Sequence, residues 1–264
     1  MTKRVLKLTN RNIFARASLV KSFLILPDLH LPYQCERYLK LIIKILKQEK
    51  FSGIVQLGDA LDFWQLSTYD KDPSRKNTIL DDVTEWNKVL SEWCRYLPRG
   101  AEIHLLEGNH CYRLQRYISR NARELHEIVK PLPDLLNLKE RNASGHVKFK
   151  WHPYAKWNSC KIGDCVLMHG FYFNQHVAMT NLAKYKVSTI CGHTHRVQYV
   201  TDGDHFSATL GHGSNEELTA HQPTPTGWQQ SMGVLTVDDN GKSSLEIILV
   251  KNGEGVFRGK KIKA

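Results

Sequence analysis

Residues 22–30 read SFLILPDLH. The apolar run predicts a buried strand, and Pro27 predicts the point at which the chain turns out of it into a loop. Asp28 and His30 follow directly, and side chains two residues apart in an extended segment point to the same side. This stretch therefore predicts a strand that presents a carboxylate and an imidazole together beyond its carboxyl end.

The same stretch begins the first of three predicted strand-and-helix units. Helical spacing of apolar residues follows it over 34–50, the run GIVQLGD at 53–59 precedes an amphipathic helix over 78–97, and AEIHLLEGNH at 101–110 precedes a helix from about 112 to 129. Successive units of this kind favour a layered core with parallel strands.

The second half of the chain, from about residue 147, has a different pattern. Short β-rich runs separated by Gly, Asn and Asp fill it, with one helix near residues 174–185. A second sheet packed face to face with the first gives a four-layer α/β/β/α sandwich, two mixed β-sheets flanked by helices. The expected organisation is a basic N-terminal arm (1–21), one domain (22–250) and a basic C-terminal tail (251–264).

The formal net charge of +11 lies mainly at the two ends. Residues 1–21 carry six basic side chains and no acidic one, and residues 251–264 carry five basic and one acidic. Such ends suit a polyanion such as DNA or RNA, or act as solubilising tails. No apolar run is long enough to span a bilayer, so no membrane partner is expected, and no secretory signal is evident.

The six cysteines are spread along the chain, with no C-x-x-C pair and no density typical of a disulfide framework. We therefore expect reduced cysteines and a cytoplasmic location. A zinc site built on thiolates is not indicated.

Five polar clusters follow predicted strands. Taken singly, each is an ordinary polar turn, but five in succession predict a metal centre, because ligands bind where loops converge at the carboxyl ends of strands. Carboxylate, imidazole and amide groups suit manganese, iron, zinc or nickel. The clusters are Asp28-Leu29-His30, Gly58-Asp59 with Asp62, Gly108-Asn109-His110, His169-Gly170 and Gly192-His193-Thr194-His195.

In this order, the motifs D-x-H, G-D-x-x-D, G-N-H, H-G and G-H-T-H resemble those of the calcineurin-like metallophosphoesterase superfamily. The resemblance implies a phosphoesterase with two divalent metal ions, most readily manganese, and a water between them that attacks phosphorus in line. It implies a first ion held by Asp28, His30, Asp59 and His195, and a second held by Asp59, Asn109, His169 and His193, with Asp59 as the bridge.

The resemblance also implies that His110 lies near the leaving oxygen, as a general acid or a charge stabiliser. Family members commonly carry an acid directly after G-N-H, where this chain has Cys111, so His110 is either less basic or paired with another acid. Asp62 is expected to orient a histidine. Asn109 is also a candidate for substrate binding, and Arg113 either contacts a substrate phosphate or is a solvated helix residue.

The substrate class stays open at this point. The basic ends, and a long stretch without clear structure at 63–80 beside the second cluster, favour a phosphodiesterase acting on nucleic acid, that is, a nuclease. One alternative is a phosphatase or phosphodiesterase for a small phosphorylated metabolite or nucleotide. Another is an inactive nucleic-acid-binding protein that retains the fold. The sequence does not indicate an oligomeric state.

Other aromatic side chains have two interpretations. Tryptophans can stack on bases, although aromatic residues more often belong to a core. His152 is expected on a strand surface. His212 and His221 follow a predicted strand and either lie near the site or, more commonly for such residues, are ordinary loop histidines. The tryptophans concerned are Trp64, Trp151, Trp157 and Trp228.

Overall fold

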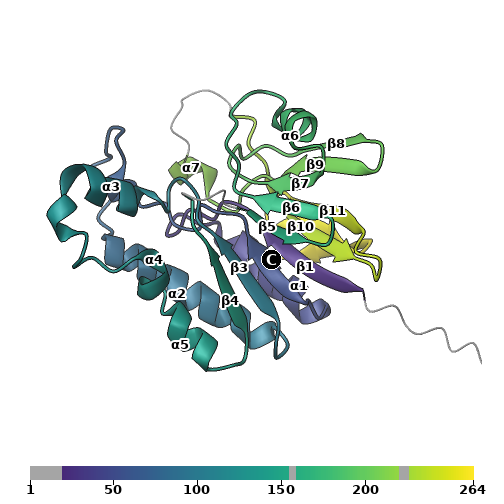
Figure 1. Ribbon diagram of the computed structural model, residues 1–264, viewed down its shortest axis with the longest axis horizontal. Coiled ribbons are helices and arrows are strands. Elements are labelled where there is room, and N and C mark those ends of the chain that lie inside the picture. Colours follow the sequence, from purple (N-terminus) through teal and green to yellow (C-terminus); the bar gives the residue numbers. More distant parts are fainter. Residues whose placement is uncertain (1–19, 155–158, 220–225) are drawn as a thin grey trace, which may run out of the picture.

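Strand β1 (Lys21–Leu26) is buried on both faces. Leu24 and Leu26 belong to one hydrophobic cluster, whereas Phe23 and Ile25 belong to another, because successive side chains of a strand point to opposite faces. The strand therefore lies in the middle of a layered structure, which the computed structural model describes for residues 20–154, 159–219 and 226–264 (Figure 1).

The first sheet has six strands in the order β11-β10-β1-β2-β3-β4. The strands from β1 to β4 run parallel, and β10 and β11 are antiparallel to their neighbours. The parallel strands bring their carboxyl ends to one edge of the sheet. The remaining bounds are β2 (Gly53–Gln56), β3 (Glu102–Leu106), β4 (Lys148–His152), β10 (Gln230–Val237) and β11 (Ser243–Val250).

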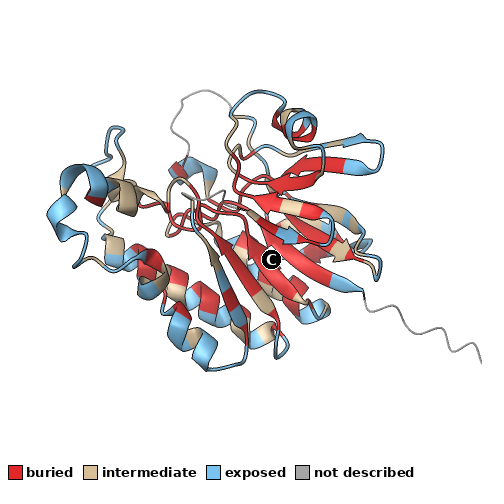
Figure 2. Ribbon diagram, in the orientation of Figure 1, coloured by how far each residue is buried: buried red, intermediate tan, exposed pale blue. Residues whose placement is uncertain are grey.

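The second sheet has five strands in the order β5-β6-β7-β9-β8 and is also mixed. Apolar side chains from both sheets share one cluster, so the sheets pack face to face. Figure 2 shows buried residues concentrated in the strands of both sheets. The strands are β5 (Ser159–Ile162), β6 (Cys165–Met168), β7 (Ser188–Cys191), β8 (Gln198–Asp202) and β9 (His205–Thr209).

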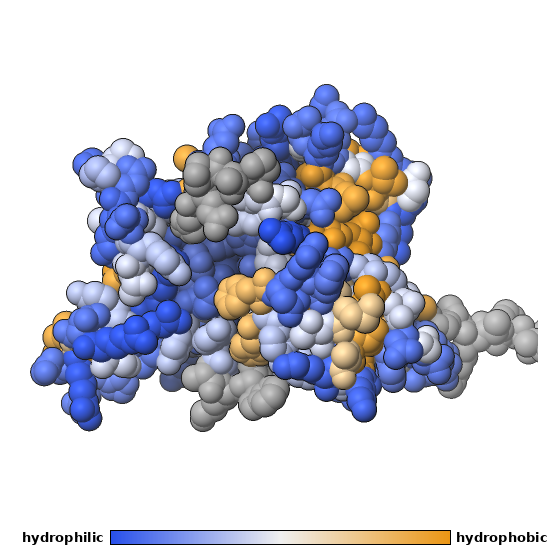
Figure 3. Space-filling view, turned by 90° about the horizontal axis from the view of Figure 1, so that it is seen from above, coloured by the Kyte–Doolittle hydropathy of each residue, from blue (hydrophilic) through white to orange (hydrophobic). Residues whose placement is uncertain are grey.

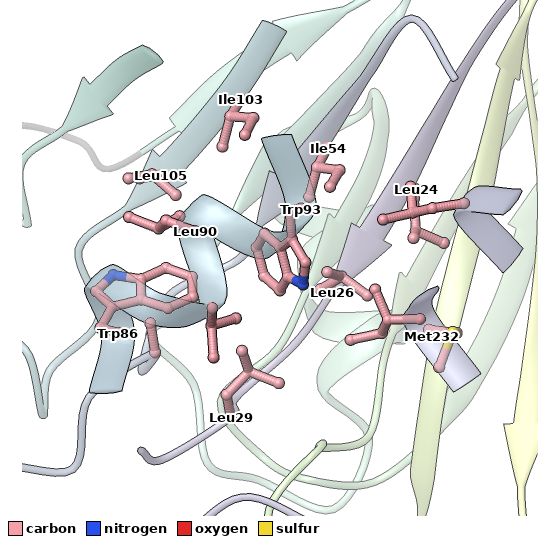
Figure 4. Close-up of a cluster of buried hydrophobic side chains, with 14 of the residues drawn as sticks. Leu24, Leu26, Leu29, Ile54, Trp86, Leu90, Trp93, Ile103, Leu105 and Met232 are labelled. Atoms are coloured by element: carbon pink, nitrogen blue, oxygen red, sulfur yellow. The ribbon is translucent and has the colours of Figure 1, made fainter. Parts of the chain in front are cut away.

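Helices cover the outer faces of both sheets. Helices α1 (Glu36–Gln48) and α2 (Ile79–Tyr96) pack on the first sheet, where the rings of Trp86 and Trp93 meet edge to face at 5.2 Å (Figure 4). Helix α6 (Val177–Tyr185) packs on the second sheet. The layers confirm the predicted α/β/β/α sandwich with two mixed sheets.

The helix predicted from about 112 to 129 is shorter than expected. Helix α3 (Arg113–Asn121) ends because the backbone at Ala122 leaves the helical region, with φ −151° and ψ 47°. Ile118 is its one buried residue, so little apolar burial holds a longer helix in place. The short elements of this half are η1 (Trp64–Leu66), η2 (Arg123–Leu125), α4 (Leu132–Leu135), α5 (Leu138–Ala143) and α7 (Glu216–Thr219).

Residues 251–264, expected as a basic tail, are structured. Strands β12 (Glu254–Phe257) and β13 (Lys260–Lys263) form a hairpin whose Phe257 and Ile262 are buried in the same cluster as α1. Burial of these two side chains attaches the segment to the domain. The predicted arm lies almost wholly outside the described residues, and the division at 21 and 250 stays a prediction.

Two further observations concern the cysteines and the helices. None of the six cysteines, all of which lie in the described residues, is paired in a disulfide. Among the helices of residues 20–154, 159–219 and 226–264, none combines the length and the apolar character that crossing a membrane requires.

Thr78 begins α2 with a capping box. Its side chain accepts a hydrogen bond from the N–H of Asp81 at 3.2 Å, and the Asp81 carboxylate accepts from the N–H of Thr78 at 2.7 Å. Thr78→Ala is expected to lower the free energy of unfolding by about 1 kcal/mol, because the N–H of Asp81 loses its partner. Chemical denaturation measures this, with Thr78→Ser as the matched control; equal losses in both variants would contradict the capping role.

Candidate metal centre

The five predicted clusters all lie in loops beyond strand ends that face the same way. Parallel pairing of β1 with β2 and β3, and of β6 with β7, brings these ends to one edge of the sandwich. Asp28 and His30 follow β1, Asp59 follows β2, Asn109 and His110 follow β3, His169 follows β6, and His193 and His195 follow β7.

One group of side chains converges on His169. Its Nδ1 lies 3.1 Å from the carbonyl oxygen of Leu57, to which it donates, so Nε2 carries a lone pair in the neutral ring. That Nε2 lies 2.9 Å from Oδ1 of Asn109, 3.2 Å from Oδ2 of Asp59 and 3.0 Å from Nδ1 of His193. Three electron-rich atoms therefore lie within 3.2 Å of this nitrogen, close enough for all four to bind one cation.

A second group joins Asp28, His30 and His195. Nε2 of His30 lies 3.1 Å from Nε2 of His195, which lies 3.5 Å from Oδ1 of Asp28. Nδ1 of His30 donates to Oδ2 of Asp62 at 3.0 Å, which leaves the lone pair of Nε2 directed at the group. Asp62 therefore contacts a predicted ligand, as the prediction requires, and its role in orienting His30 stays a prediction.

Asp59 lies with the group around His169. Its other oxygen, Oδ1, accepts a hydrogen bond from the backbone N–H of His110 at 2.7 Å. The structure therefore brings all seven predicted ligands into two adjoining groups, Asp28, His30 and His195 in one and Asp59, Asn109, His169 and His193 in the other. Their metal binding, and the bridging role of Asp59, stay predictions.

The backbone around the two groups is held in unusual conformations. Ten described residues other than glycine have positive φ, and five of them are predicted ligands, Asp28, His30, Asp59, His193 and His195. Such conformations persist at functional sites because the surrounding fold enforces them. Two glycines let the carboxylates approach: a Cβ at Gly108 would lie 2.0 Å from Oδ1 of Asp59, and one at Gly192 would lie 2.1 Å from Oδ2 of Asp28.

Charges in the centre are strongly coupled. Burial is the largest single influence on His169 and disfavours its imidazolium. The charge of Asp59 and its hydrogen bond, with smaller contributions from other neighbours, together outweigh burial and raise the pKa of His169 to about 9. Burial, followed by the charge of His169, lowers the pKa of His193 to about 3. Burial disfavours the Asp59 carboxylate, yet the charges of His169 and His110 hold its pKa well below the usual range. Buried carboxylates that stay ionised among imidazoles fit divalent cations.

His110 has a carboxylate partner despite Cys111. Nδ1 of His110 lies 3.4 Å from Oδ2 of Asp62, within ion-pair distance. Cys111 is buried in the hydrophobic cluster beneath α2, with Sγ 3.8 Å from the carbonyl oxygen of Leu61. Asp62 thus supplies the acid that the residue after G-N-H lacks. Arg113 joins the group, donating to the carbonyl oxygen of Asp62 at 2.9 Å and lying 3.2 Å from Nε2 of His110.

A pocket of about 680 Å³ opens over the centre. Leu66, Thr68 and Tyr69 line it, so the stretch 63–80 does border the site, as the sequence predicts. Arg116 and Arg120 line it too, and sequence reasoning missed both. Their spacing from Arg113, three and seven residues along α3, was the available signal, because such positions share a helix face. The molecule seen from above is hydrophilic over most of this face (Figure 3).

His212 is buried and not an ordinary loop residue. Its ring stacks on His195 at 5.0 Å, and Trp228, which lines the pocket, meets His195 edge-on at 4.2 Å. Trp151 packs against the core instead. Trp157 and His221 lie outside the described residues.

Comparison with known proteins identifies the family of this chain. The sequence model of the family described as calcineurin-like phosphoesterase matches residues 21–245, whereas no curated protein matches. Among solved structures, Vacuolar Protein Sorting 29 from Cryptosporidium parvum shares 14% identity, with 93% of this chain and 99% of that chain covered and a TM-score of 0.49. Vps29 from Entamoeba histolytica complexed with zinc shares 14%, with 91% and 96% covered and a TM-score of 0.44. Nuclease MPE from Pseudomonas putida shares 16%, with 85% and 87% covered and a TM-score of 0.37. Because the family's sequence model spans most of its length, the chain belongs to the calcineurin-like phosphoesterase family.

Proposed function

We propose that this chain is a metal-dependent phosphodiesterase that cleaves nucleic acid in the cytoplasm. Membership of a phosphoesterase family supports hydrolysis of a phosphate ester. The choice of substrate rests on the row of Arg113, Arg116 and Arg120 in the pocket. Five of the seven predicted ligands line the same pocket: His30, Asp59, Asn109, His193 and His195. A row of guanidinium groups suits successive phosphates of a strand.

In this proposal the two groups of side chains each hold one divalent ion, manganese in the first instance, with zinc, iron or nickel as alternatives. Ions bound there would neutralise phosphoryl oxygens and lower the pKa of a water molecule. The first ion is assigned to Asp28, His30, Asp59 and His195, and the second to Asp59, Asn109, His169 and His193. Asn109 is also close enough to the second group to orient a substrate oxygen.

His110, Asp62 and Arg113 act together in the proposal. Without substrate, the Arg113 guanidinium lies against Nε2 of His110, and Asp62 lies against Nδ1. A phosphate that accepts hydrogen bonds from Arg113 draws the guanidinium away, so that Nε2 can take up a proton from water and pass it to the leaving oxygen.

The basic surface relevant to a polymer is α3 and not the C-terminal segment. Arg258 pairs with Glu49 and Glu246, and Lys261 and Lys263 pair with Glu254, so those cations are partly neutralised. Aromatic side chains stand near the arginines in the pocket and offer faces on which bases stack: Tyr69, Tyr117, Phe173 and Trp228.

The double variant Arg116→Ala/Arg120→Ala is expected to weaken binding of single-stranded DNA about tenfold or more. The logarithm of the association constant falls linearly with the logarithm of the salt concentration. Loss of two phosphate contacts makes this slope shallower by about 1.4, or about 0.7 for each contact. Fluorescence anisotropy across a salt series measures both quantities, and hydrolysis of bis-p-nitrophenyl phosphate is expected to be unchanged.

Arg99→Ala is the matched control, because Arg99 is exposed and precedes β3, at the opposite end of the strand from the centre. An unchanged salt slope in the double variant, or an equal change in the control, would remove α3 from the proposed interface.

A substrate panel tests the function itself. With manganese added, the chain is expected to hydrolyse bis-p-nitrophenyl phosphate and single- or double-stranded DNA, and to prefer diesters over p-nitrophenyl phosphate. Turnover of the monoester alone would replace the nuclease with a phosphatase for a small metabolite. Bound metal without turnover of any substrate would favour an inactive nucleic-acid-binding protein.

A further inference from the structure

A second cluster of metal-binding side chains lies outside the pocket, at the edge where the two sheets meet. His104 of β3 and His152 of β4 come from adjacent strands of the first sheet, and Cys160 comes from β5, the edge strand of the second. His104 and Cys160 are only 5% and 7% exposed, and His152 is half-buried. None of the three belongs to the centre described above.

The distance between the two ring nitrogens of this cluster fits a tetrahedral zinc ion. Nδ1 of His104 lies 3.2 Å from Nε2 of His152. One ring nitrogen of each histidine and Sγ of Cys160 all lie within 4.8 Å of one another. Tetrahedral zinc, with its usual bond lengths, separates two nitrogen ligands by about 3.3 Å and a nitrogen from a sulfur by about 3.6 Å. A small inward shift of the thiol completes the arrangement.

Glu102 orients His104 as a carboxylate orients many metal-binding histidines. Nε2 of His104 lies 3.2 Å from Oε2 of Glu102, and because the carboxylate only accepts, the ring donates there and keeps the lone pair on Nδ1. The other carboxylate oxygen binds Nζ of Lys150 at 2.9 Å, which offsets the positive charge of this lysine near the cluster. The Nδ1 lone pair therefore points at His152 and at the space beside Cys160.

The protonation states also suit a metal. Burial lowers the pKa of His104, although the hydrogen bond to Glu102 opposes the shift. Burial, with the charges of His104 and Lys150, lowers the pKa of His152 to about 4, so both rings are neutral at pH 7. Burial raises the pKa of Cys160 to about 12. Its thiol is protonated until a cation replaces the proton.

We propose that His104, His152 and Cys160 bind one zinc ion that ties the edge strand of the second sheet to the first, with water as the fourth ligand. Imidazole and thiolate ligands select zinc, whereas the carboxylate-rich centre accepts harder ions such as manganese. The ion reaches the site from a neighbouring cavity of about 520 Å³ that Glu102, His104 and Lys150 help to line. The sequence does not indicate this site, because the chain has no C-x-x-C pair and its pattern predicts His152 on the surface of a strand.

Cobalt(II) titration of the full chain tests the site separately from the phosphoesterase centre. A thiolate bound to cobalt gives a strong charge-transfer absorption in the near ultraviolet, and the other centre contains no predicted cysteine ligand. The wild-type chain is expected to show this band for about one cobalt ion per chain. Cys160→Ser is expected to abolish it, and His104→Ala to weaken cobalt binding at least tenfold.

Cys165→Ser is the matched control, because Cys165 is buried in the same inter-sheet cluster but lies outside the group of three. Zinc is expected to raise the Tm of the wild type and of this control by about 5 °C more than that of Cys160→Ser. A cobalt band that survives Cys160→Ser would overturn the proposal.

X-ray absorption of the unmodified chain loaded with zinc gives a test that needs no variant. A sulfur neighbour at about 2.3 Å is expected in addition to nitrogen and oxygen. A shell of nitrogen and oxygen alone, with no cobalt band, would mean that His104 and His152 form only a hydrogen-bonded pair. Because neither readout depends on turnover, failure of the proposed nuclease activity leaves this result intact.

Discussion

Asp59→Asn is expected to lower phosphodiester turnover by at least about a thousandfold and to empty the centre of bound metal. One Asp59 oxygen lies 3.2 Å from Nε2 of His169, and the other accepts the backbone N–H of His110 at 2.7 Å. An amide keeps the size of the side chain but replaces an anionic oxygen with an NH₂ group, which repels a cation. The substitution also removes the negative charge of Asp59, which would balance the charge of the ions.

Metal content per chain and the initial rate, measured on the same purified sample, check this result. Asp204→Asn serves as the control, because it removes a carboxylate from an exposed residue between β8 and β9. A variant that keeps its full metal content and hydrolyses the diester at the wild-type rate would exclude Asp59 from the centre.

His110→Ala is expected to lower turnover of DNA by about 10²–10⁴-fold while bound metal is retained. The ring lines the pocket between the carboxylate of Asp62 and the guanidinium of Arg113, and its backbone, not its side chain, contacts Asp59. Loss of the ring therefore removes a proton donor and leaves both groups of predicted ligands in place.

The leaving group distinguishes the two roles considered for His110. A nitrophenolate departs without a proton, so a general acid predicts a much smaller loss with bis-p-nitrophenyl phosphate than with DNA. A charge stabiliser predicts similar losses with both substrates. Departure of metal from His110→Ala, measured on the purified variant, would make His110 a ligand and would contradict the assignment.

Much of the centre could be predicted because its signals are local. An apolar run followed by Asp28 and His30 marks a strand end, and similar runs precede Asp59, Asn109 and His169. Parallel strands then carry these ends to one edge, so the order of motifs along the chain is enough to predict that they meet. The layered fold follows from the same periodicities.

Long-range partners could not be predicted in this way. Asp62 lies 48 positions before His110 and 32 after His30, yet its carboxylate contacts both rings. Nothing around Cys111 indicates that an acid from another loop takes the place of the missing neighbour. The length of α3 was overestimated for a related reason, since its end depends on how little apolar surface it can bury.

The sequence by itself determined which residues reach the carboxyl ends of the strands, because the alternation of apolar and polar residues acts over a few neighbours. Only the tertiary structure decided what packs beside them: Asp62 against His110, His212 and Trp228 against His195, and Arg116 and Arg120 along the pocket. It also decided that His104, His152 and Cys160 meet. Those contacts depend on how the two sheets and their loops pack against each other. This packing minimises the exposed apolar area of the whole chain, and no short segment specifies that packing.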